Sequence, residues 1–478
     1  MTLIEHLAEF ATHTRYAELP PRVVEECKRD ILDSIGCALA APGQPKADMG
    51  IECAIRIGGN DGPATIIGTG QRSSIFGAAF ANGELISTLD ADSVLLPGHV
   101  SPYVLPGAFA VAEVARRSGK ELIEAVAVSH EMSYRFGAAM SQNRDYKDGK
   151  AATAPVLGYS STVFGATASA ARLKRLTADQ VANAFGIAAA ITPVNAHRAS
   201  LNHAPPATIK YLMAGALTQS ALTAAEMGEL GHRGDLQMLD DAEFGYPRFI
   251  GTVRWEPKAL TEGLGVEWRF PDFQMYKPYP HCRVMHAPLD ILIGLVHEHD
   301  LRPDEIEGIT AYGEGWAYVL PSFMFREIRH VQDAQFCFAH GLALAAHRIV
   351  PGPKWQDPKN VFDPSVMKLM DKVKLEIHPT YFDEIAKHPS SRPSRVEIRA
   401  RGQTFRGERL FPKGTPSSDP ESFLTTEALA HKFRTFVDGL MPAAAAEEVI
   451  DAVLHLEQVD DFSTLMRKLV NQPKKRRS

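Results

Sequence analysis

Four short segments of the chain place charged or histidine side chains among proline, glycine or apolar neighbours. Histidine titrates near neutral pH, so it can take up or release a proton in the physiological range. Lysine and arginine can stabilise negative charge that develops on a reacting oxygen. These segments could therefore carry out acid–base chemistry on an anionic substrate. They are Asp90-Ala91-Asp92-Ser93 with the later His99, His203 to Lys210, Lys277-Pro278-Tyr279-Pro280-His281-Cys282-Arg283, and Phe336-Cys337-Phe338-Ala339-His340.

Each segment also has an ordinary structural explanation. Asp90 and Asp92 could cap a helix, and Lys210 could extend its ammonium group to solvent from a helix of small residues. The Lys-Pro-Tyr-Pro run is typical of a loop. A single histidine on an apolar helix, such as His340, is usually a hydrogen-bonded core residue. No segment identifies a site by itself.

The sequence lacks the common signatures of cofactor and metal sites. It has no glycine-rich nucleotide loop after a strand, no His-Glu-x-x-His pair and no Gly-x-Ser-x-Gly elbow. Its five cysteines include no Cys-x-x-Cys pair and show no zinc spacing, which is typical of reduced thiols in a cytoplasmic protein. The candidate segments are also rich in cations, which repel a metal ion. We therefore expect neither a metal nor a cofactor.

Composition and net charge limit the classes of binding partner that the chain is expected to have. The chain has 478 residues, of which 45% are hydrophobic and 23% charged, as in ordinary globular proteins. Its net charge of −6 gives no indication of a nucleic-acid partner. The longest stretch without charge, residues 151–171, is too rich in Ser, Thr and Gly for a membrane span. We expect a cytoplasmic protein without membrane or nucleic-acid partners.

Helical patterning dominates the first half of the chain. Apolar residues from Val24 to Leu39 recur every three or four positions after Pro20-Pro21, which marks one face of a helix. Alanine and glycine are frequent in the later helical segments, so these helices can approach one another closely. Helices are predicted over 21–41, 104–117, 120–137, 162–174, 178–191 and 208–228.

The patterning changes near residue 250. Alternating, β-branched segments predict strands at 308–312 and 373–377 and a hairpin over 395–409 that turns at Gly402. Helices are predicted between them at 283–299 and 333–348, and again after about residue 420 at 425–439 and 443–455. The order helical, mixed, helical indicates that the last helices pack back onto the first domain.

Several of these stretches, in this order, resemble the MmgE/PrpD family over about residues 1–455. They are Leu32-Asp33-Ser34-Ile35-Gly36-Cys37-Ala38-Leu39, Val104-Leu105-Pro106-Gly107-Ala108, Ser129 to Gly137, Val163 to Leu173, and Lys277 to Arg283. The resemblance implies a mainly α fold, with a large all-helical domain built from both chain ends (1–265 plus 420–470) and an inserted, smaller α+β lid domain (266–419). It also implies a homodimer. The family's activities are 2-methylcitrate dehydratase, cis-aconitate decarboxylase and iminodisuccinate epimerase, which act on small polycarboxylates without a metal.

The resemblance also implies roles for individual residues. The family's Leu-Asp-Phe-Asp-Asp-Thr loop is similar to Leu89-Asp90-Ala91-Asp92-Ser93, one residue shorter, and the histidine after it corresponds to His99. Two family lysines correspond to Lys210 and Lys277, and His203 resembles the dehydratase branch. The predicted catalytic residues are Asp90, His99, Lys210, Lys277 and His340. The predicted substrate contacts are Ser93, Tyr159, His203, Cys282 and Arg283.

Three departures from the family pattern weaken a decarboxylase assignment. The segment that ends at Tyr159 lacks a histidine that decarboxylases carry, and Cys282 stands where they have another. His340 occupies the position of a usual tyrosine. The first hypothesis is therefore a hydro-lyase for a tricarboxylate such as 2-methylcitrate. An epimerase or isomerase, a cis-aconitate-type decarboxylase, and a non-catalytic carboxylate-binding paralogue remain alternatives.

The expected mechanism starts with abstraction of a proton next to a substrate carboxylate. His99 and His340 are the candidate base and acid. Lys210, Lys277 and Arg283 would stabilise the enolate-like dianion, with Arg283 as a bidentate clamp, and Asp90 would orient His99 or contact a substrate hydroxyl. The five catalytic candidates should line one cleft between the helical domain and the lid.

Overall fold

The computed structural model describes residues 1–142, 144, 146, 147, 150, 151, 154, 156–194, 197–210 and 212–470. The fold is mainly α. The longer helices of the first half are α1 (Leu3–His13), α2 (Pro21–Ala40), α3 (Pro45–Gly58), α4 (Ile75–Thr88), α5 (Ser101–Val114), α6 (Gly119–Ala139), α7 (Thr162–Leu173), α8 (Ala178–Ile191) and α10 (Ala214–Glu229). The short elements there are α9 (His197–Leu201), α11 (Tyr246–Phe249), α12 (Lys258–Thr261), β1 (Ala64–Thr65), β2 (Arg72–Ser73), β3 (Tyr146–Lys147) and β4 (Lys150–Ala151).

Local sequence explains where the main helices begin. Helix α2 opens with a proline at its first turn, where a missing N–H costs nothing. Ser118 and Glu121 form a capping box at the start of α6, and Thr177 and Gln180 do the same for α8. The central helices α4, α5 and α7 are buried almost all round, so their alanine-rich faces pack against one another.

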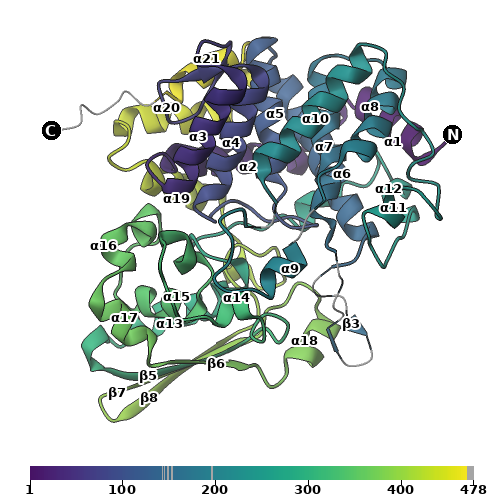
Figure 1. The fold of residues 1–478 in the computed structure, drawn as a ribbon. Helices are drawn as coiled ribbons and strands as arrows, with labels where there is room; N and C mark the ends of the chain where they lie inside the picture. The colour runs from purple at the N-terminus through teal and green to yellow at the C-terminus, as the bar shows by residue number, and fades with distance from the viewer. Residues whose placement is uncertain are drawn as a thin grey trace.

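The last three helices pack on the first ones. Helices α19 (Thr426–Val437) and α20 (Ala443–Leu454) contact α2, and α21 (Ser463–Lys468) contacts α5. Figure 1 shows these yellow helices among the purple and blue ones. A Cβ atom at Gly36 would lie 3.0 Å from the ring of Phe433, so glycine permits the close approach of α2 and α19. This packing agrees with the expectation for residues beyond about 420.

A four-stranded sheet lies in the other part of the molecule (Figure 1). Its strand order is β6 (Val373–Ile377), β5 (Ile306–Gly313), β7 (Ser394–Ala400) and β8 (Gln403–Arg409). The β5–β6 pair is parallel, with Ile309 opposite Val373, whereas β7 pairs antiparallel with both β5 and β8. The β7–β8 hairpin turns through Arg401 and Gly402, which both have positive φ.

Helices cover one face of this sheet. Helix α13 (His286–Glu298) packs on β7 and β8, and α15 (Phe338–Ala346) packs on α13 and β6. Alternate residues of β7 are buried, as a strand with one covered face requires. The short helices around the sheet are α14 (Pro321–Met324), α16 (Pro358–Val361), α17 (Pro364–Met370) and α18 (Tyr381–Lys387). The division into domains at 265 and 420 stays a prediction.

Two predicted helices are shorter than expected. The helix expected from residue 208 begins at Ala214, because the residues before it form turns and Lys210 has a φ of 60°. The helix expected from residue 333 begins at Phe338, after a separate 3₁₀ turn at Val331–Gln335. Both candidate segments therefore enter their helices through irregular backbone.

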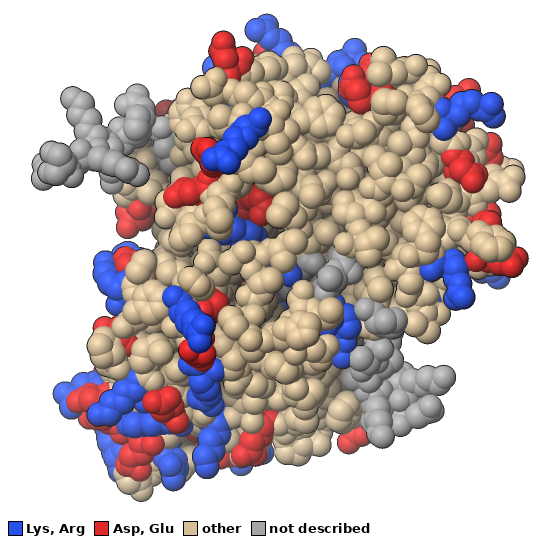
Figure 2. All heavy atoms as spheres, viewed as in Figure 1, with Lys and Arg blue, Asp and Glu red and all other residues tan. Residues whose placement is uncertain are grey.

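The surface carries charges of both signs. Figure 2 shows lysines, arginines and acids side by side over the β7–β8 hairpin, and ion pairs such as Arg406–Glu408 and Arg401–Glu305 lie there. In the described part of the chain, no helix is both long and apolar enough to cross a bilayer.

Candidate active site

The loop between α4 and α5 carries four of the predicted residues. Asp90, Asp92, Ser93 and His99 are all buried. Asp90 follows the end of α4 directly and has a φ of 53°, in the left-handed region that aspartate tolerates better than most residues. Val94 pairs with Met275 through two backbone hydrogen bonds of 2.8 Å, which brings the segment before Lys277 alongside this loop.

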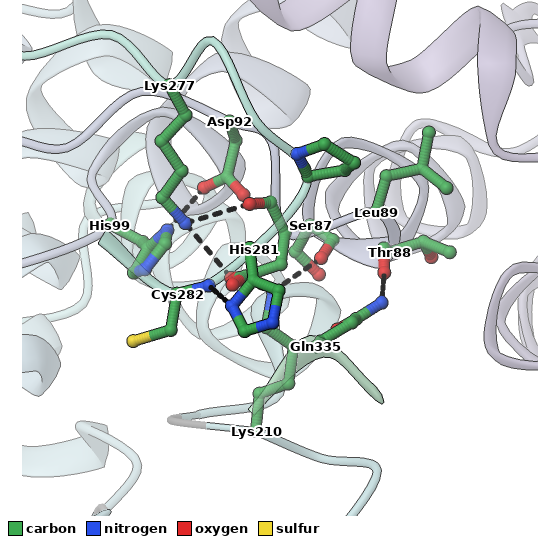
Figure 3. Close-up of polar contacts among 12 residues, drawn as sticks. Ser87, Thr88, Leu89, Asp92, His99, Lys210, Lys277, His281, Cys282 and Gln335 are labelled. Carbon is green, nitrogen blue, oxygen red and sulfur yellow. Dashed lines mark hydrogen bonds and ion pairs between the residues drawn. The ribbon is translucent and has the colours of Figure 1, made fainter. Parts of the chain in front are cut away.

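Two glutamines from later in the chain hold the end of α4. Gln335 Nε2 donates to the carbonyl of Thr88 at 2.8 Å, and Gln356 Nε2 donates to that of Leu89 at 2.7 Å. Both side chains are buried. Carbonyls at a helix C-terminus lack partners within the helix. Here they are bound by side chains from the part of the chain around the sheet, as Figure 3 shows for Gln335 and Thr88, and these contacts hold the end of α4 that leads into Asp90.

Asp90 gathers the two predicted lysines. Lys210 Nζ and Lys277 Nζ lie 2.9 and 3.0 Å from the same Asp90 oxygen, Oδ1. Lys210 also donates to the carbonyl of Ser87 at 2.6 Å, and Lys277 to the carbonyl of Asp90 at 2.9 Å. Burial by itself raises the pKa of Asp90, but the two ammonium groups outweigh it and lower the pKa to about 2. The carboxylate is therefore ionised and holds two buried cations together.

His99 is oriented by Asp92 and not, as expected, by Asp90. His99 Nδ1 donates to Asp92 Oδ2 at 2.5 Å. Burial and the nearby lysines lower the pKa of His99, although Asp92 opposes them. The ring is therefore neutral at neutral pH and carries its lone pair on Nε2. Asp90 Oδ1 binds the two lysines, whereas Asp92, two residues on, contacts His99. The other expected role of Asp90, contact with a substrate hydroxyl, stays a prediction.

Ser93 anchors the loop between α4 and α5 to the helical part of the molecule. Its Oγ donates to Asp30 Oδ1 at 2.5 Å, and Ser101 Oγ lies 2.9 Å from the same carboxylate. His130 Nε2 lies 2.9 Å from the other oxygen of Asp30. All four side chains are buried in the helical part. The geometry thus gives Ser93 a positioning contact within the protein and places it outside the lining of the cavity described next.

A cavity of about 130 Å³ lies beside His99. Four of the predicted residues line it, namely His99, Tyr159, Cys282 and Arg283. The five catalytic candidates were expected to line one cleft, but His99 alone among them lines this cavity. Asp90, Lys210 and Lys277 bind one another outside its lining, and His340 does not line it either. Its wall also includes polar residues that sequence reasoning did not single out, namely Ser141, Gln142, Arg144 and Arg392. Neither Arg144 nor Arg392 belongs to a recognisable motif, so local sequence held no signal for them. Met275, Trp316 and Phe323 supply apolar parts of the wall.

His340 and His203 lie apart from these groups. The His340 ring is buried, and its Nε2 lies 2.8 Å from the carbonyl of Val361, near the end of α16. It therefore has the position of a structural histidine, and the acid–base role is left to His99 and another group. His203 is exposed, and it is not among the residues that line the cavity.

Asp90, Asp92 and His99 offer ligand atoms within 4.8 Å of one another, a spacing that could hold a metal ion. The ammonium groups of Lys210 and Lys277 already occupy Asp90 Oδ1. A divalent cation would have to displace them or lie beside two positive charges, and Coulomb repulsion opposes both.

We expect exhaustive chelation to leave the activity unchanged, because the lysines supply the positive charge that a metal would otherwise provide. The measurement is turnover before and after treatment with a strong chelator, followed by addition of single divalent metals. Loss of turnover that one specific metal restores would contradict this prediction and make the Asp90–Asp92–His99 cluster a metal site.

The chain was compared with known families and curated proteins. The family model for the MmgE/PrpD N-terminal domain matches residues 5–258, and that for the C-terminal domain matches residues 279–458. A cis-aconitate decarboxylase from Aspergillus terreus is 24% identical over 499 aligned residues, which cover 98% of this chain and 96% of the relative. The cis-aconitate decarboxylase from Homo sapiens is 26% identical over 487 residues, covering 97% and 94%. Two matched domains in the expected order span nearly the whole chain, so this protein belongs to the MmgE/PrpD family.

Proposed function

We propose that the protein is a lyase that removes a proton next to a carboxylate of a small di- or tricarboxylate and then expels water, as a 2-methylcitrate dehydratase does. The observation that carries this proposal is the placement of a neutral, carboxylate-oriented His99 beside two buried ammonium groups. With a base but no cations, the dianion formed by proton removal would not be stabilised. With cations but no base, the substrate would bind but not react.

Each step can be given to a residue of the site. His99 Nε2 takes the proton from the carbon next to the carboxylate, and the electron pair moves into an enolate stabilised by Lys210 and Lys277. The pair then forms the carbon–carbon double bond as the hydroxyl on the neighbouring carbon leaves. Burial raises the pKa of Tyr159, so its phenol stays protonated and can donate the proton that turns the leaving hydroxide into water. His99 finally returns a proton to Tyr159.

A second candidate is decarboxylation of a cis-aconitate-like substrate. It is favoured by the two relatives described above, which are named as cis-aconitate decarboxylases. We favour dehydration, because the stretch from Val156 to Tyr159 lacks the histidine that decarboxylase-like members carry there, and Cys282 stands where they have another histidine. Among the described residues that line the cavity, His99 is the one histidine. The inserted lid, which would enclose the substrate, and a homodimer of 52.3 kDa chains remain part of this proposal.

The test is turnover of 2-methylcitrate, citrate, cis-aconitate and iminodisuccinate by the full-length protein. We expect at least one hydroxylated tricarboxylate to give a new alkene, detected by ultraviolet absorbance, without release of CO2. Release of CO2 from cis-aconitate would show that the protein is a decarboxylase, and the dehydratase proposal would be wrong. If the folded protein converts no member of the panel and binds none of them, the proposal is wrong.

A further inference from the structure

Three arginines line the same cavity as His99. Arg144, Arg283 and Arg392 all line the cavity, together with Tyr159 and Cys282. They come from the region after α6, from the segment before α13 and from the loop before β7. The tertiary structure alone brings together side chains so far apart in sequence. Like charges repel one another, so their clustering in a cavity needs a compensating interaction.

Their positive charge exceeds the negative charge near them. Glu314 is fully buried and contacts Arg392 Nη1, and Arg144 Nε lies 3.5 Å from its other oxygen. Arg283, by contrast, donates to the carbonyl of Lys413 at 2.7 Å and to the hydroxyl of Thr415, which are neutral acceptors. In the part of the chain that the structure describes, Glu314 is the one carboxylate in contact with these three guanidinium groups. Asp290 lies within electrostatic range of Arg283 but also pairs with Arg409. A buried excess of charge is costly unless an anion offsets it.

Two N–H groups of these arginines are also without an acceptor. Arg392 Nε and Arg283 Nε are buried and make no hydrogen bond, whereas Arg392 Nη1 and Arg144 Nε lie against Glu314. Arg392 is itself only 8% exposed. More than nine in ten buried polar groups in proteins are hydrogen-bonded. A carboxylate is a strong acceptor for guanidinium N–H groups, so these buried donors fit such a ligand.

The arginines and His99 belong to one cavity. Tyr159 lines the same cavity and is within electrostatic range of both groups: Asp90 and Asp92 raise its pKa, and Arg392 opposes them, in addition to the larger effect of burial. Cys282 lies within electrostatic range of both Lys210 and Arg392. His99 and the three arginines line this one cavity, so a ligand in it can contact His99 and the arginines at the same time.

We propose that Arg392, with Arg144 and Arg283, binds a substrate carboxylate remote from the carbon that loses its proton. This rests on the proposed function, and it narrows the substrate class: the substrate must carry a second carboxylate beyond the reacting end. The lysines stabilise charge that develops during the reaction, whereas the arginines bind charge that is already there. The arginines therefore set affinity and specificity, and the lysines set rate.

The test uses propane-1,2,3-tricarboxylate, which has no hydroxyl to lose, and butanoate, which has a single carboxylate. Binding to the full-length protein is measured by calorimetry. We expect Arg392→Gln to weaken binding of the tricarboxylate by about 10- to 100-fold, the usual range for lost charge-assisted hydrogen bonds. Binding of butanoate should weaken much less. Arg392→Lys, which keeps the charge but loses the fork, should fall between. Arg406→Gln, on the exposed β7–β8 hairpin, is the matched control and should bind both ligands as the unmodified protein does.

Removing Arg392 leaves Glu314 buried without its partner and could prevent folding. The double variant Arg392→Gln with Glu314→Gln removes both charges, and thermal unfolding shows whether it is folded. It should bind the tricarboxylate as weakly as the single variant. Affinity of either folded variant equal to that of the unmodified protein would overturn the proposal, as would an equal loss for both ligands.

The subsite and the proposed function can fail separately. If no panel substrate reacts but the tricarboxylate still binds through Arg392, the dehydratase proposal is wrong and the subsite stands. If a substrate reacts and Arg392→Gln leaves its KM unchanged, the subsite is wrong and the reaction stands.

Discussion

Replacing His99 by alanine is expected to lower kcat by a factor of about 10²–10⁴, the usual contribution of a positioned general base, while the protein stays folded. The imidazole lines the cavity and is kept neutral by burial and the nearby lysines. The carboxylate of Asp92, 2.5 Å from Nδ1, orients the ring. Without it, the substrate proton has no acceptor in place. The measurement is steady-state turnover of whichever panel substrate the unmodified protein converts.

The pH dependence should identify the same group. Burial lowers the pKa of His99 below its ordinary value of 6.5, and the base must be unprotonated to act. The value of kcat/KM should therefore be constant above pH 6.5 and fall on the acid side, as pH passes down through the lowered pKa. His455→Ala removes an exposed histidine and serves as the control. A loss of less than tenfold in His99→Ala, or an unchanged acid limb, would move the base to another residue.

Asp90→Asn is expected to cost about 3–5 kcal/mol of unfolding free energy, the range found when one partner of a buried ion pair is removed, and to abolish most of the turnover. Lys210 and Lys277 both lie within 3.0 Å of Asp90 Oδ1, and both are buried. An amide cannot offset two ammonium charges. The variant would either release the lysines towards solvent or deprotonate one of them, and either change removes a cation from the site.

The destabilisation should depend on pH in a definite direction. The pKa of Asp90 is lowered from 3.8 to about 2, so its ionised form stabilises the folded state above pH 3.8. This stabilisation is lost as pH falls from 3.8 to about 2. The difference in unfolding free energy between the unmodified protein and Asp90→Asn, measured in urea, should therefore shrink within that window.

Two further variants test whether the loss of stability in Asp90→Asn comes from the uncompensated lysine charges. Asp304→Asn changes an exposed carboxylate and should leave stability unchanged. Adding Lys210→Met to Asp90→Asn removes one of the uncompensated cations, so the double variant should be more stable than Asp90→Asn alone. If the second substitution destabilises the protein further by its full single-variant cost, the two residues are not energetically coupled.

Sequence reasoning located regular elements better than it located the site. The predicted helix over 178–191 matches α8, and the predicted hairpin over 395–409 contains β7 and β8 with Gly402 in the turn. Periodicity reports which face of an element is buried, and this depends mostly on neighbouring residues. The prediction failed at residue 208, because the positive φ of Lys210 breaks the helix there and no pattern marks such a turn.

Only some of the residues of the site could be predicted from the sequence. Its family motifs named Asp90, His99, Lys210 and Lys277, and the structure brings these four side chains into one buried cluster. The motifs gave no basis for choosing between Asp90 and Asp92 as the partner of His99. That choice depends on the direction of the chain through residue 90, where φ is 53°.

The residue types, helices and family motifs of this protein were determined by its sequence alone, because they depend on composition and on neighbours a few positions apart. Only the tertiary structure decided that His340 hydrogen-bonds to the carbonyl of Val361 and that Arg144 and Arg392 line one cavity with Tyr159. It also decided that Lys432 of α19 reaches Asp33 and the carbonyl of Ala91, both at 2.6 Å. These contacts join residues up to 399 positions apart. Their geometry comes from the packing of whole elements, which local sequence spacing does not encode.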